Sequence, residues 1–430
     1  MTGTIDDCSC NVDTVDYYNN VKIYPRLKSL LTNNYFRFYK TNLRNECPFW
    51  RDVDFQCAMR FCNVETCEDK DIPLGLKGEL PHQKYLKEIQ NVGCSEDLNE
   101  ELGFLNKSIS DKVHQDLKKW SEHDDAQDNF CILDDNHDSA EYVDLLLNPE
   151  RYTGYQGKSA HRIWETIYKE NCFKSEDSKQ PTSYSSLIDF QSLRDACLEE
   201  RVFYRMVSGL HSSINIHLCV NYLQSEKNSA VNFASPAGVW GPNLKEFKRR
   251  FSPEITGSQG EHWLRNLYFA YIVELRAIAK IAPLLRNEEF YTGFDSDDKE
   301  VQLAVKDLLK VIETFPTHFD ESIMFNGGSS KLKYEFREKF LNITRIMDCV
   351  GCDKCRLWGK LQTQGMGTAL KILFSGKFEL DSEHNNLIML SDPKQPQFKL
   401  RRQEIVSLFN AFGRLSNSIH SLELFRNQLR

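Results

Sequence analysis

Three cysteines spaced three residues apart, Cys349, Cys352 and Cys355, constrain the fold of this chain more than any other feature of its sequence. Residues 356–374 follow them with the apolar spacing of a helix, so the last two cysteines stand where that helix begins. Unpaired backbone N–H groups and the positive end of the helix dipole lower a thiol pKa at such a position. The pattern therefore predicts one redox-active pair among these three cysteines and a third cysteine that ties the segment to another part of the chain.

Metal ligation is the main alternative for such a cluster. Structural zinc needs a second cysteine or histidine pair, and His211 and His217 are six residues apart, which places them about 120° apart around a helix. The ferredoxin motif C-x2-C-x2-C-x3-C-P fails because Gly359 and Lys360 stand where its fourth cysteine and proline should be. We therefore expect thiol–disulfide chemistry and no metal site, with a metal-binding cysteine module as an alternative.

Composition and charge exclude other classes of protein. The 430 residues are 40% hydrophobic, which is ample for a large core, and 54 Lys+Arg against 62 Asp+Glu give a net charge of −8. This balance argues against a nucleic-acid partner, because phosphate backbones require clustered cations. No run of 18 apolar residues is present, so we expect no transmembrane helix. The start lacks the apolar stretch of a signal peptide, and we interpret the chain as a mature or trimmed form.

The fourteen cysteines are grouped, which suggests an oxidising compartment with both structural and working disulfides. The sequons at Asn106 and Asn342 fit a secretory route and a glycoprotein. Cys57 and Cys62 form a C-x4-C pair in a weakly structured region, where they can be a mobile dithiol or a local disulfide. Cys67 and Cys94 offer alternative partners that could lock this loop by mispairing.

Apolar residues recur at helical spacing through most of the second half of the chain. We expect helices at 202–218, 264–281, 300–314, 331–347, 356–374 and 402–412, and a separate last helix after Gly413. No convincing strands are expected, and 173–186, 292–300 and 376–398 look like surface loops. We predict a mainly α protein, a single large helical domain over 1–430, with a mobile cysteine-bearing loop at about 48–145.

Electrons that leave a dithiol need an acceptor, and several stretches combine aromatic rings with Arg or His. They contain Arg151, Thr153 and Trp164, then Ser208 and His211, and then Arg250. Aromatic rings can stack on a flat cofactor, and Arg and His can pair with a pyrophosphate. Each of these residues alone is better explained as an ion-pair partner or a satisfied core residue. No Gly-x-Gly-x-x-Gly motif supports a Rossmann nucleotide site.

Taken together, these segments resemble the endoplasmic reticulum oxidoreductins, in particular the animal members. The similarity covers nearly the whole chain, and its most specific block runs from Asp348 to Lys371. Its other segments are Phe36-Arg37-Phe38-Tyr39-Lys40, Cys47-Pro48-Phe49-Trp50, Asn148 through Gly154, and Phe203-Tyr204-Arg205.

The resemblance implies an FAD-dependent thiol oxidase built around a helix bundle that holds FAD. Cys352 and Cys355 would form the inner disulfide, with Cys355 nearer the flavin, and Cys57 and Cys62 would form the shuttle pair. The shuttle would take electrons from protein disulfide isomerase or related thioredoxin-fold proteins and pass them inward, and the flavin would give them to O2, which becomes H2O2. The resting enzyme would carry the regulatory disulfides Cys57–Cys94 and Cys62–Cys67.

The remaining site residues also follow from the resemblance. Structural bridges would join Cys47 to Cys349 and Cys172 to Cys197, and Cys131 would be unpaired. FAD contacts would fall on Arg151, Thr153, Trp164, Ser208, His211 and Arg250. This chain departs from the family in carrying Trp263 where an arginine is usual, and Arg265 or His262 could replace that contact.

The resemblance also implies the endoplasmic reticulum lumen and a role in oxidative protein folding, with any peripheral membrane association made through partners. Cys8 and Cys10 match N-terminal family cysteines whose upstream partners are absent from this sequence, and Cys219 has no assigned role. The alternatives to the enzyme are a non-catalytic, disulfide-stapled binding protein of the secretory pathway and a metal-binding module.

Overall fold

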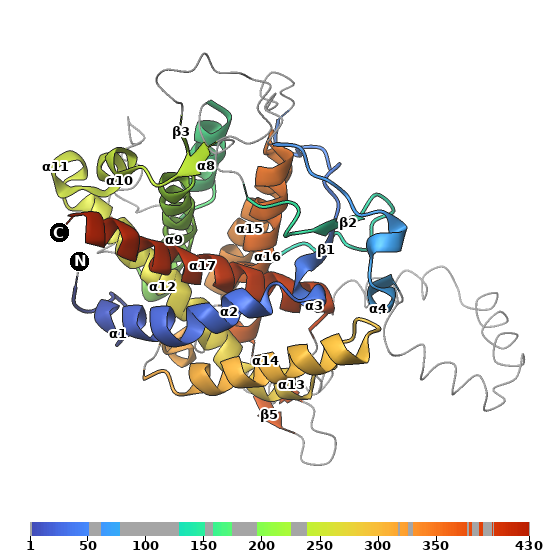
Figure 1. The fold of residues 1–430 in the computed structure, drawn as a ribbon. Helices are drawn as coiled ribbons and strands as arrows, with labels where there is room; N and C mark the ends of the chain where they lie inside the picture. The colour runs from blue at the N-terminus through green and yellow to red at the C-terminus, as the bar shows by residue number, and fades with distance from the viewer. Residues whose placement is uncertain are drawn as a thin grey trace, which may run out of the picture.

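A computed structural model of the chain describes residues 2–50, 62–77, 129–150, 158–173, 196–224, 239–316, 319–325, 330–375, 378–380, 387–389, 398 and 400–429. These residues are mainly helical, as the sequence predicts (Figure 1). No helix among them is sufficiently long and apolar to cross a membrane.

The helices are the following segments: α1 Val12–Tyr17, α2 Tyr24–Leu30, α3 Asn34–Arg37, α4 Leu74–Lys77, α8 Lys158–Glu170, α9 Leu198–Val220, α10 Leu244–Phe251, α11 Pro253–Thr256, α12 Gln259–Lys280, α13 Ala282–Asn287, α14 Asp295–Glu313, α15 Ser330–Ile346, α16 Asp353–Phe374 and α17 Arg402–Leu429. A π-helical segment, Tyr18–Ile23, joins α1 to α2, and single 3₁₀ turns occupy Asp69–Asp71, Glu321–Ile323 and Met347–Cys349.

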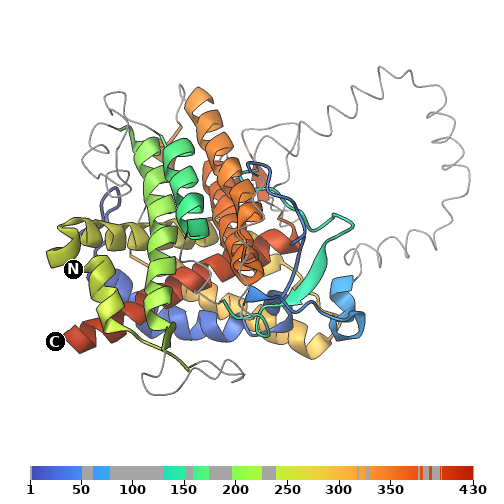
Figure 2. The same cartoon turned by 90° about the horizontal axis from the view of Figure 1, so that it is seen from above.

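Four long helices, α9, α12, α16 and α17, form the centre of the bundle, and α9 packs along α12 as α16 packs along α17. They are apolar on more than one face, so most of their side chains are buried, including Phe269 and Tyr271 of α12 and Phe409 and Phe412 of α17. In both views α17 runs beside α2, so segments from opposite ends of the sequence share one core (Figure 1 and Figure 2).

The predicted break at Gly413 is wrong, because α17 continues through this residue to Leu429. A side chain at position 413 would meet the Leu31 side chain at 2.3 Å, so the glycine permits close packing against the end of α2. The tertiary contacts on both sides of Gly413 outweigh its weak intrinsic helix propensity. The predicted loop at 292–300 is also wrong beyond Phe294, where α14 begins at Asp295 with a run of acidic residues at its positive end.

Three short two-stranded antiparallel sheets were not expected from the sequence. They pair β1 (Phe38–Thr41) with β2 (Glu141–Asp144), β3 (Tyr222–Gln224) with β4 (Val239–Gly241), and β5 (Phe378–Leu380) with β6 (Leu387–Met389). The first sheet joins segments about a hundred residues apart, with Phe38 opposite Asp144. Strands of three or four residues are too short for a period-2 pattern to reveal.

Candidate active site

Cys352 is the N-cap of α16, as the sequence predicts. Its backbone is extended (φ −109°, ψ 115°), and its Sγ accepts a hydrogen bond from the Cys355 backbone N–H at 3.3 Å. Both side chains are buried, and neither sulfur belongs to a disulfide. A side-chain hydrogen bond from Cys355 lowers the pKa of the Cys352 thiol, and backbone N–H donors of Cys355 and Lys354 reinforce this against burial and the Asp353 charge. The helix start therefore favours a thiolate on Cys352.

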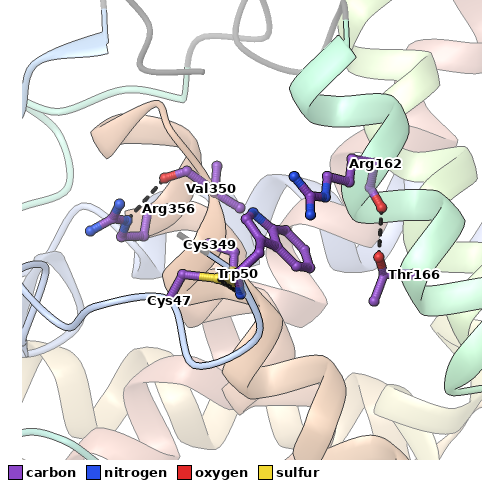
Figure 3. Close-up of a disulfide and its surroundings, with 7 residues drawn as sticks. All are labelled: Cys47, Trp50, Arg162, Thr166, Cys349, Val350 and Arg356. Atoms are coloured by element: carbon purple, nitrogen blue, oxygen red, sulfur yellow. Dashed lines mark hydrogen bonds between the residues drawn. A yellow bond between two sulfur atoms is a disulfide. The ribbon is translucent and has the colours of Figure 1, made fainter. Parts of the chain in front are cut away.

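The third cysteine of the cluster, Cys349, forms a disulfide with Cys47 across 302 residues of sequence. This is the pair that the family resemblance implies. Next to it the Trp50 backbone N–H donates to Cys47 Sγ at 3.3 Å. The Trp50 ring lies between the disulfide and Arg162 of α8, whose guanidinium carbon is 4.5 Å from the ring centroid (Figure 3). The segment that leads toward Cys57 is thus fixed close to the dithiol helix.

The segment that returns from the shuttle cysteines is fixed beside the same helix. Glu65 exchanges two hydrogen bonds with the buried Asn148 side chain, at 2.8 Å and 2.7 Å. The Asn148 carbonyl accepts a hydrogen bond of 2.8 Å from Trp358 Nε1 of α16. Cys67 N–H also donates to the Tyr142 carbonyl of β2 at 2.8 Å. Both ends of residues 51–61 are therefore attached next to α16.

The disulfides around the shuttle differ from the expected resting set. Cys62 is disulfide-bonded, whereas Cys67 carries a free thiol, so the structure represents a state without the Cys62–Cys67 bridge. Cys57 and Cys94 lie outside the described residues.

The implied bridge between Cys172 and Cys197 is not formed either, since both carry free thiols in the structure. Cys172 follows the end of α8, and Cys197 caps the start of α9 with its backbone N–H bonded to Glu200. Each cysteine is thus placed by its own helix.

The other described cysteines are thiols removed from the site. Burial raises the pKa of Cys131 to about 12 and that of Cys219 to about 12, so neither is a ready nucleophile. Cys8 and Cys10 are also thiols, and the Cys10 N–H donates to Cys8 Sγ at 3.4 Å. Among these residues only Cys131 was expected from the resemblance to be unpaired.

A cavity lies against the dithiol helix. Its walls come from α8, α9, α15, α16 and α17, and its apolar surface includes Ile163, Trp164, Ile167, Leu210, Ile343 and Met347. Cys355 lies on its wall, followed along α16 by Gly359 and Gln362. These three positions share one helix face because they are four and seven residues apart. The apolar lining suits a flat cofactor ring.

Trp164 and His211 form one aromatic pair at this cavity, with ring centroids 3.7 Å apart and planes inclined by 11°. Tyr168 Oη lies 3.1 Å from His211 Nδ1. Burial, with a smaller contribution from the Arg250 charge, lowers the pKa of His211 to about 3, so the imidazole is neutral. The structure thus brings together two of the predicted cofactor residues.

The other predicted cofactor residues lie further along the same elements or outside them. Ser208 is one turn before His211 on α9, and its hydroxyl accepts a hydrogen bond from Asn266 at 3.0 Å. Arg250 of α10 donates to Glu246 at 2.8 Å and to Asn215 of α9 at 2.5 Å. Arg151 and Thr153 lie outside the described residues.

The described residues on either side of residues 151–157 contact this cavity. On one side, the Glu150 carboxylate pairs with Arg414 at 2.6 Å, both side chains being buried, and Arg414 lines the cavity. On the other side, Ser159 also lines it.

Trp263 occupies the position where the family usually has arginine, and its carbonyl accepts a hydrogen bond of 2.8 Å from Ser212. Arg265 donates to the carbonyls of Thr2 and Thr4 and pairs with Glu261 at 2.9 Å. The arginine suggested as a replacement contact is therefore engaged with the N-terminal segment.

Sequence reasoning missed Gln362, Arg162 and Arg414. Gln362 is buried, and neither of its amide atoms has a hydrogen-bond partner within the described parts of the chain. Its spacing of seven residues from Cys355 was a usable signal, because it predicts the same helix face. Arg162 and Arg414 carry no comparable local signal, since their partners are distant in sequence.

These residues fit FAD: the cavity is apolar, is lined by an indole, contains the dithiol sulfur and holds a buried amide with unused hydrogen-bonding capacity. The isoalloxazine ring of a flavin has apolar faces and a polar edge, so it requires this combination of apolar walls and a buried hydrogen-bonding group.

Comparison with known proteins agrees with this geometry. Residues 22–422 match the family Endoplasmic Reticulum Oxidoreductin 1 (ERO1). The chain is 58% identical to the Ero1-like protein of Drosophila melanogaster over 441 residues, covering 100% of this chain and 90% of that relative. It is 46% identical to the human ERO1-like protein alpha over 445 residues, covering 100% and 91%.

A solved structure is also similar, that of Ero1p, described as a source of disulfide bonds for oxidative protein folding in the cell. It matches with a TM-score of 0.62 and 27% identity over 97% of this chain and 98% of that one.

Proposed function

Because this chain belongs to the endoplasmic reticulum oxidoreductin family and is a thiol oxidase of oxidative protein folding, we propose the route that its electrons take. They enter from a reduced protein disulfide isomerase at Cys57 and Cys62 and pass to Cys352 and Cys355, where FAD would serve as the acceptor that connects the inner pair to O2. The observation that supports this order best is the position of Cys355 on the cavity wall that Trp164 also lines.

The attachment of the shuttle segment supports the transfer from Cys57 to the inner pair. Cys47 is covalently bound to Cys349, which is three residues before Cys352. Cys57 is ten positions after Cys47 in sequence, and an extended chain covers roughly 3.4 Å per residue, so this attachment keeps Cys57 within about 34 Å of Cys47.

The exchange itself is two thiol–disulfide displacements. A shuttle thiolate attacks Cys352 Sγ of the oxidised inner pair, which forms a mixed disulfide and releases the Cys355 thiolate. The second shuttle thiolate then attacks the shuttle sulfur of that mixed disulfide and releases Cys352. The shuttle pair ends as a disulfide and the inner pair as a dithiol. The lowered pKa of Cys352 assists the second displacement, because a thiol of low pKa leaves faster.

FAD bound in this cavity would supply a two-electron acceptor for the inner pair and a donor to O2, which would give H2O2. Trp164 and His211 would hold its ring system, and Ser208, Arg250, Arg151 and Thr153 would hold the rest. The neutral state of His211 suits a stacked or hydrogen-bonding role rather than a charged one. The apolar wall keeps bulk thiols away from the reacting sulfur.

The family supplies the setting of this reaction: a protein disulfide isomerase as partner and the endoplasmic reticulum as compartment. We propose that the chain works in the lumen, and that any membrane association is made through partner proteins. Cys57–Cys94 and Cys62–Cys67 are proposed as a resting pairing that removes the shuttle from its working state. The free thiol of Cys67 is then that of a non-resting state.

The test replaces the inner cysteines one at a time. Cys352→Ala and Cys355→Ala are expected to reduce oxygen uptake with reduced protein disulfide isomerase to the background rate, since neither variant can form the inner disulfide. Both variants are expected to retain flavin absorption, because the other cavity residues are intact. Oxygen consumption and the visible spectrum of the purified proteins measure the two effects.

Cys219→Ala is the matched control, because Cys219 is a buried thiol of α9 outside the site. Its turnover is expected to equal that of the unmodified protein. Normal oxygen uptake by either inner-cysteine variant would contradict the proposed route, and a colourless unmodified protein would contradict the proposed cofactor.

A further inference from the structure

Gln362 is the one side chain of the cavity wall for which the mechanism above has no use and the fold gives no partner within the described residues. It is 2% exposed, and both its Oε1 and its Nε2 lack hydrogen-bond partners there. An amide buried without a protein partner costs free energy unless a ligand or solvent in the cavity meets its hydrogen-bonding capacity. A buried polar group without a partner in the protein is explained when a ligand supplies that partner.

The Gln362 side chain lines the same cavity as Cys355, so both residues would contact the same ligand. Cys355 and Gln362 are seven residues apart on α16, two helical turns, and both line the cavity with Trp164. The thiol and the amide therefore face a common space from one rigid helix, separated along the axis by about 10 Å at 1.5 Å per residue. This is close to the length of a three-ring aromatic system.

The neighbouring buried glutamine on the same helix behaves differently. Gln364 is also buried, but its Oε1 accepts a hydrogen bond from Tyr39 Oη, and it lines a second cavity rather than this one. Thr363 bonds its own helix, donating to the Gly359 carbonyl at 2.9 Å. The fold thus gives the Thr363 hydroxyl and the Gln364 Oε1 partners, with only Gln364 Nε2 left over, whereas both amide atoms of Gln362 face the cavity without one.

We propose that Gln362 is a flavin-binding residue that recognises the polar edge of the isoalloxazine ring. A primary amide presents one acceptor and one donor side by side. The pyrimidine edge of a flavin likewise presents a carbonyl beside an N–H, so the two can form a paired set of hydrogen bonds. The inference rests on the proposed function, because it requires FAD in the cavity that Cys355 lines.

The experiment compares Gln362→Leu with Gln364→Leu in the full-length chain. FAD is titrated into each apoprotein, with quenching of flavin fluorescence as the measure of binding. Gln362→Leu is expected to weaken FAD binding about 5- to 100-fold, the loss that follows when a buried hydrogen bond is removed. The visible absorption bands of its flavin are also expected to shift relative to those of the unmodified holoprotein.

Thermal unfolding of the apoproteins separates this role from a structural one. Gln362→Leu is expected to leave the apoprotein melting temperature unchanged or higher, because it removes an amide that has no partner. Gln364→Leu is expected to lower the melting temperature, since Tyr39 loses its acceptor, while FAD affinity and spectrum stay unchanged.

Unchanged FAD affinity and spectrum in Gln362→Leu would overturn the inference and leave the proposed function standing if the unmodified protein binds FAD. A fall in apoprotein stability with no selective loss of FAD would also overturn it, since Gln362 would then be structural. Failure of the unmodified protein to bind FAD would remove the proposed function as well.

Discussion

The chemistry of Cys352 comes from its immediate neighbours. The Cys355 side chain is its strongest stabilising donor, the backbone N–H groups of Cys355 and Lys354 add to it, and the Asp353 carboxylate opposes it. The pKa of a cysteine at the N-cap of a helix is thus set by residues one to three places away. This is the reason why the sequence alone could identify it.

We predict that in the reduced protein Cys352 is alkylated with a pH midpoint below the ordinary cysteine value. Cys355→Ala removes the S–H donor, so the pKa of Cys352 and the midpoint should rise. Cys355→Ser keeps an O–H donor at the same place and should keep the midpoint low. The rate of iodoacetamide labelling of Cys352 as a function of pH, followed by peptide mass spectrometry, measures it.

Asp353→Asn is expected to change the pKa of Cys352 in the opposite direction to Cys355→Ala. It removes a negative charge that raises the Cys352 pKa, so its midpoint should fall below that of the unmodified protein. The same midpoint in all four proteins would show that the thiolate is not stabilised by these contacts.

Residues whose role depends on partners near in sequence were predictable, and those with distant partners were not. The spacing of the three cysteines indicated a dithiol at a helix start, and the family resemblance identified Cys352 and Cys355 as that pair. The contact between Trp50 and Arg162 and the ion pair between Glu150 and Arg414 join segments more than a hundred residues apart. No local pattern encodes such contacts, so the cavity they border emerges only from the fold.

At the scale of elements, α16 connects the parts of the site. The dithiol lies at its start and its side chains form one wall of the cavity. The segments before and after residues 51–61 are attached beside it, through the Cys47–Cys349 disulfide and through Asn148 and Trp358. Lys360 lies 2.6 Å from both Asp134 and Asp348, and Arg356 donates to the Leu43 carbonyl at 2.6 Å. The position of this helix is set largely by α17, against which it packs closely.

Gly365 permits that packing. A Cβ at this position would meet the Ser407 carbonyl oxygen at 2.3 Å and the Ala411 Cβ at 2.4 Å. We predict that Gly365→Ala lowers the free energy of unfolding by about 1–3 kcal/mol, as overpacked cores do, despite an expected gain of about 1 kcal/mol in helix propensity. Denaturant unfolding followed by circular dichroism measures the change.

Gly359→Ala is the control on the same helix. Its added Cβ would meet only the flexible side chain of Met347, at 2.7 Å. A methionine can adjust its rotamers, so the apoprotein of this variant should be nearly as stable as the unmodified one. A cost at Gly359 equal to that at Gly365 would mean that the α16–α17 contact is not the reason.

At the scale of the whole molecule, the two ends of the sequence form one core. Tyr268 Oη of α12 donates to Asp16 at 2.6 Å, and Arg426 of α17 donates to the same hydroxyl at 2.7 Å. The Cys47–Cys349 disulfide also links the N-terminal and C-terminal parts of the chain covalently, beside the active site. We therefore propose that residues 1–430 fold as one domain, which the helical periodicity suggested and the long-range contacts support.

This proposal predicts a single unfolding transition, with circular dichroism and tryptophan fluorescence changing together. Removing the bridge in a Cys47→Ala/Cys349→Ala variant should move that transition as a whole and cost about 5 kcal/mol, because the bridge closes a loop of 302 residues and restricts the unfolded chain. Cys219→Ala, which breaks no bridge, should cost about 1 kcal/mol from lost packing. Two separate transitions in the unmodified protein would contradict the single domain. If the Cys47→Ala/Cys349→Ala variant lost only about as much stability as Cys219→Ala, the bridge would act only locally, by holding the segment around Cys47 against the start of α16.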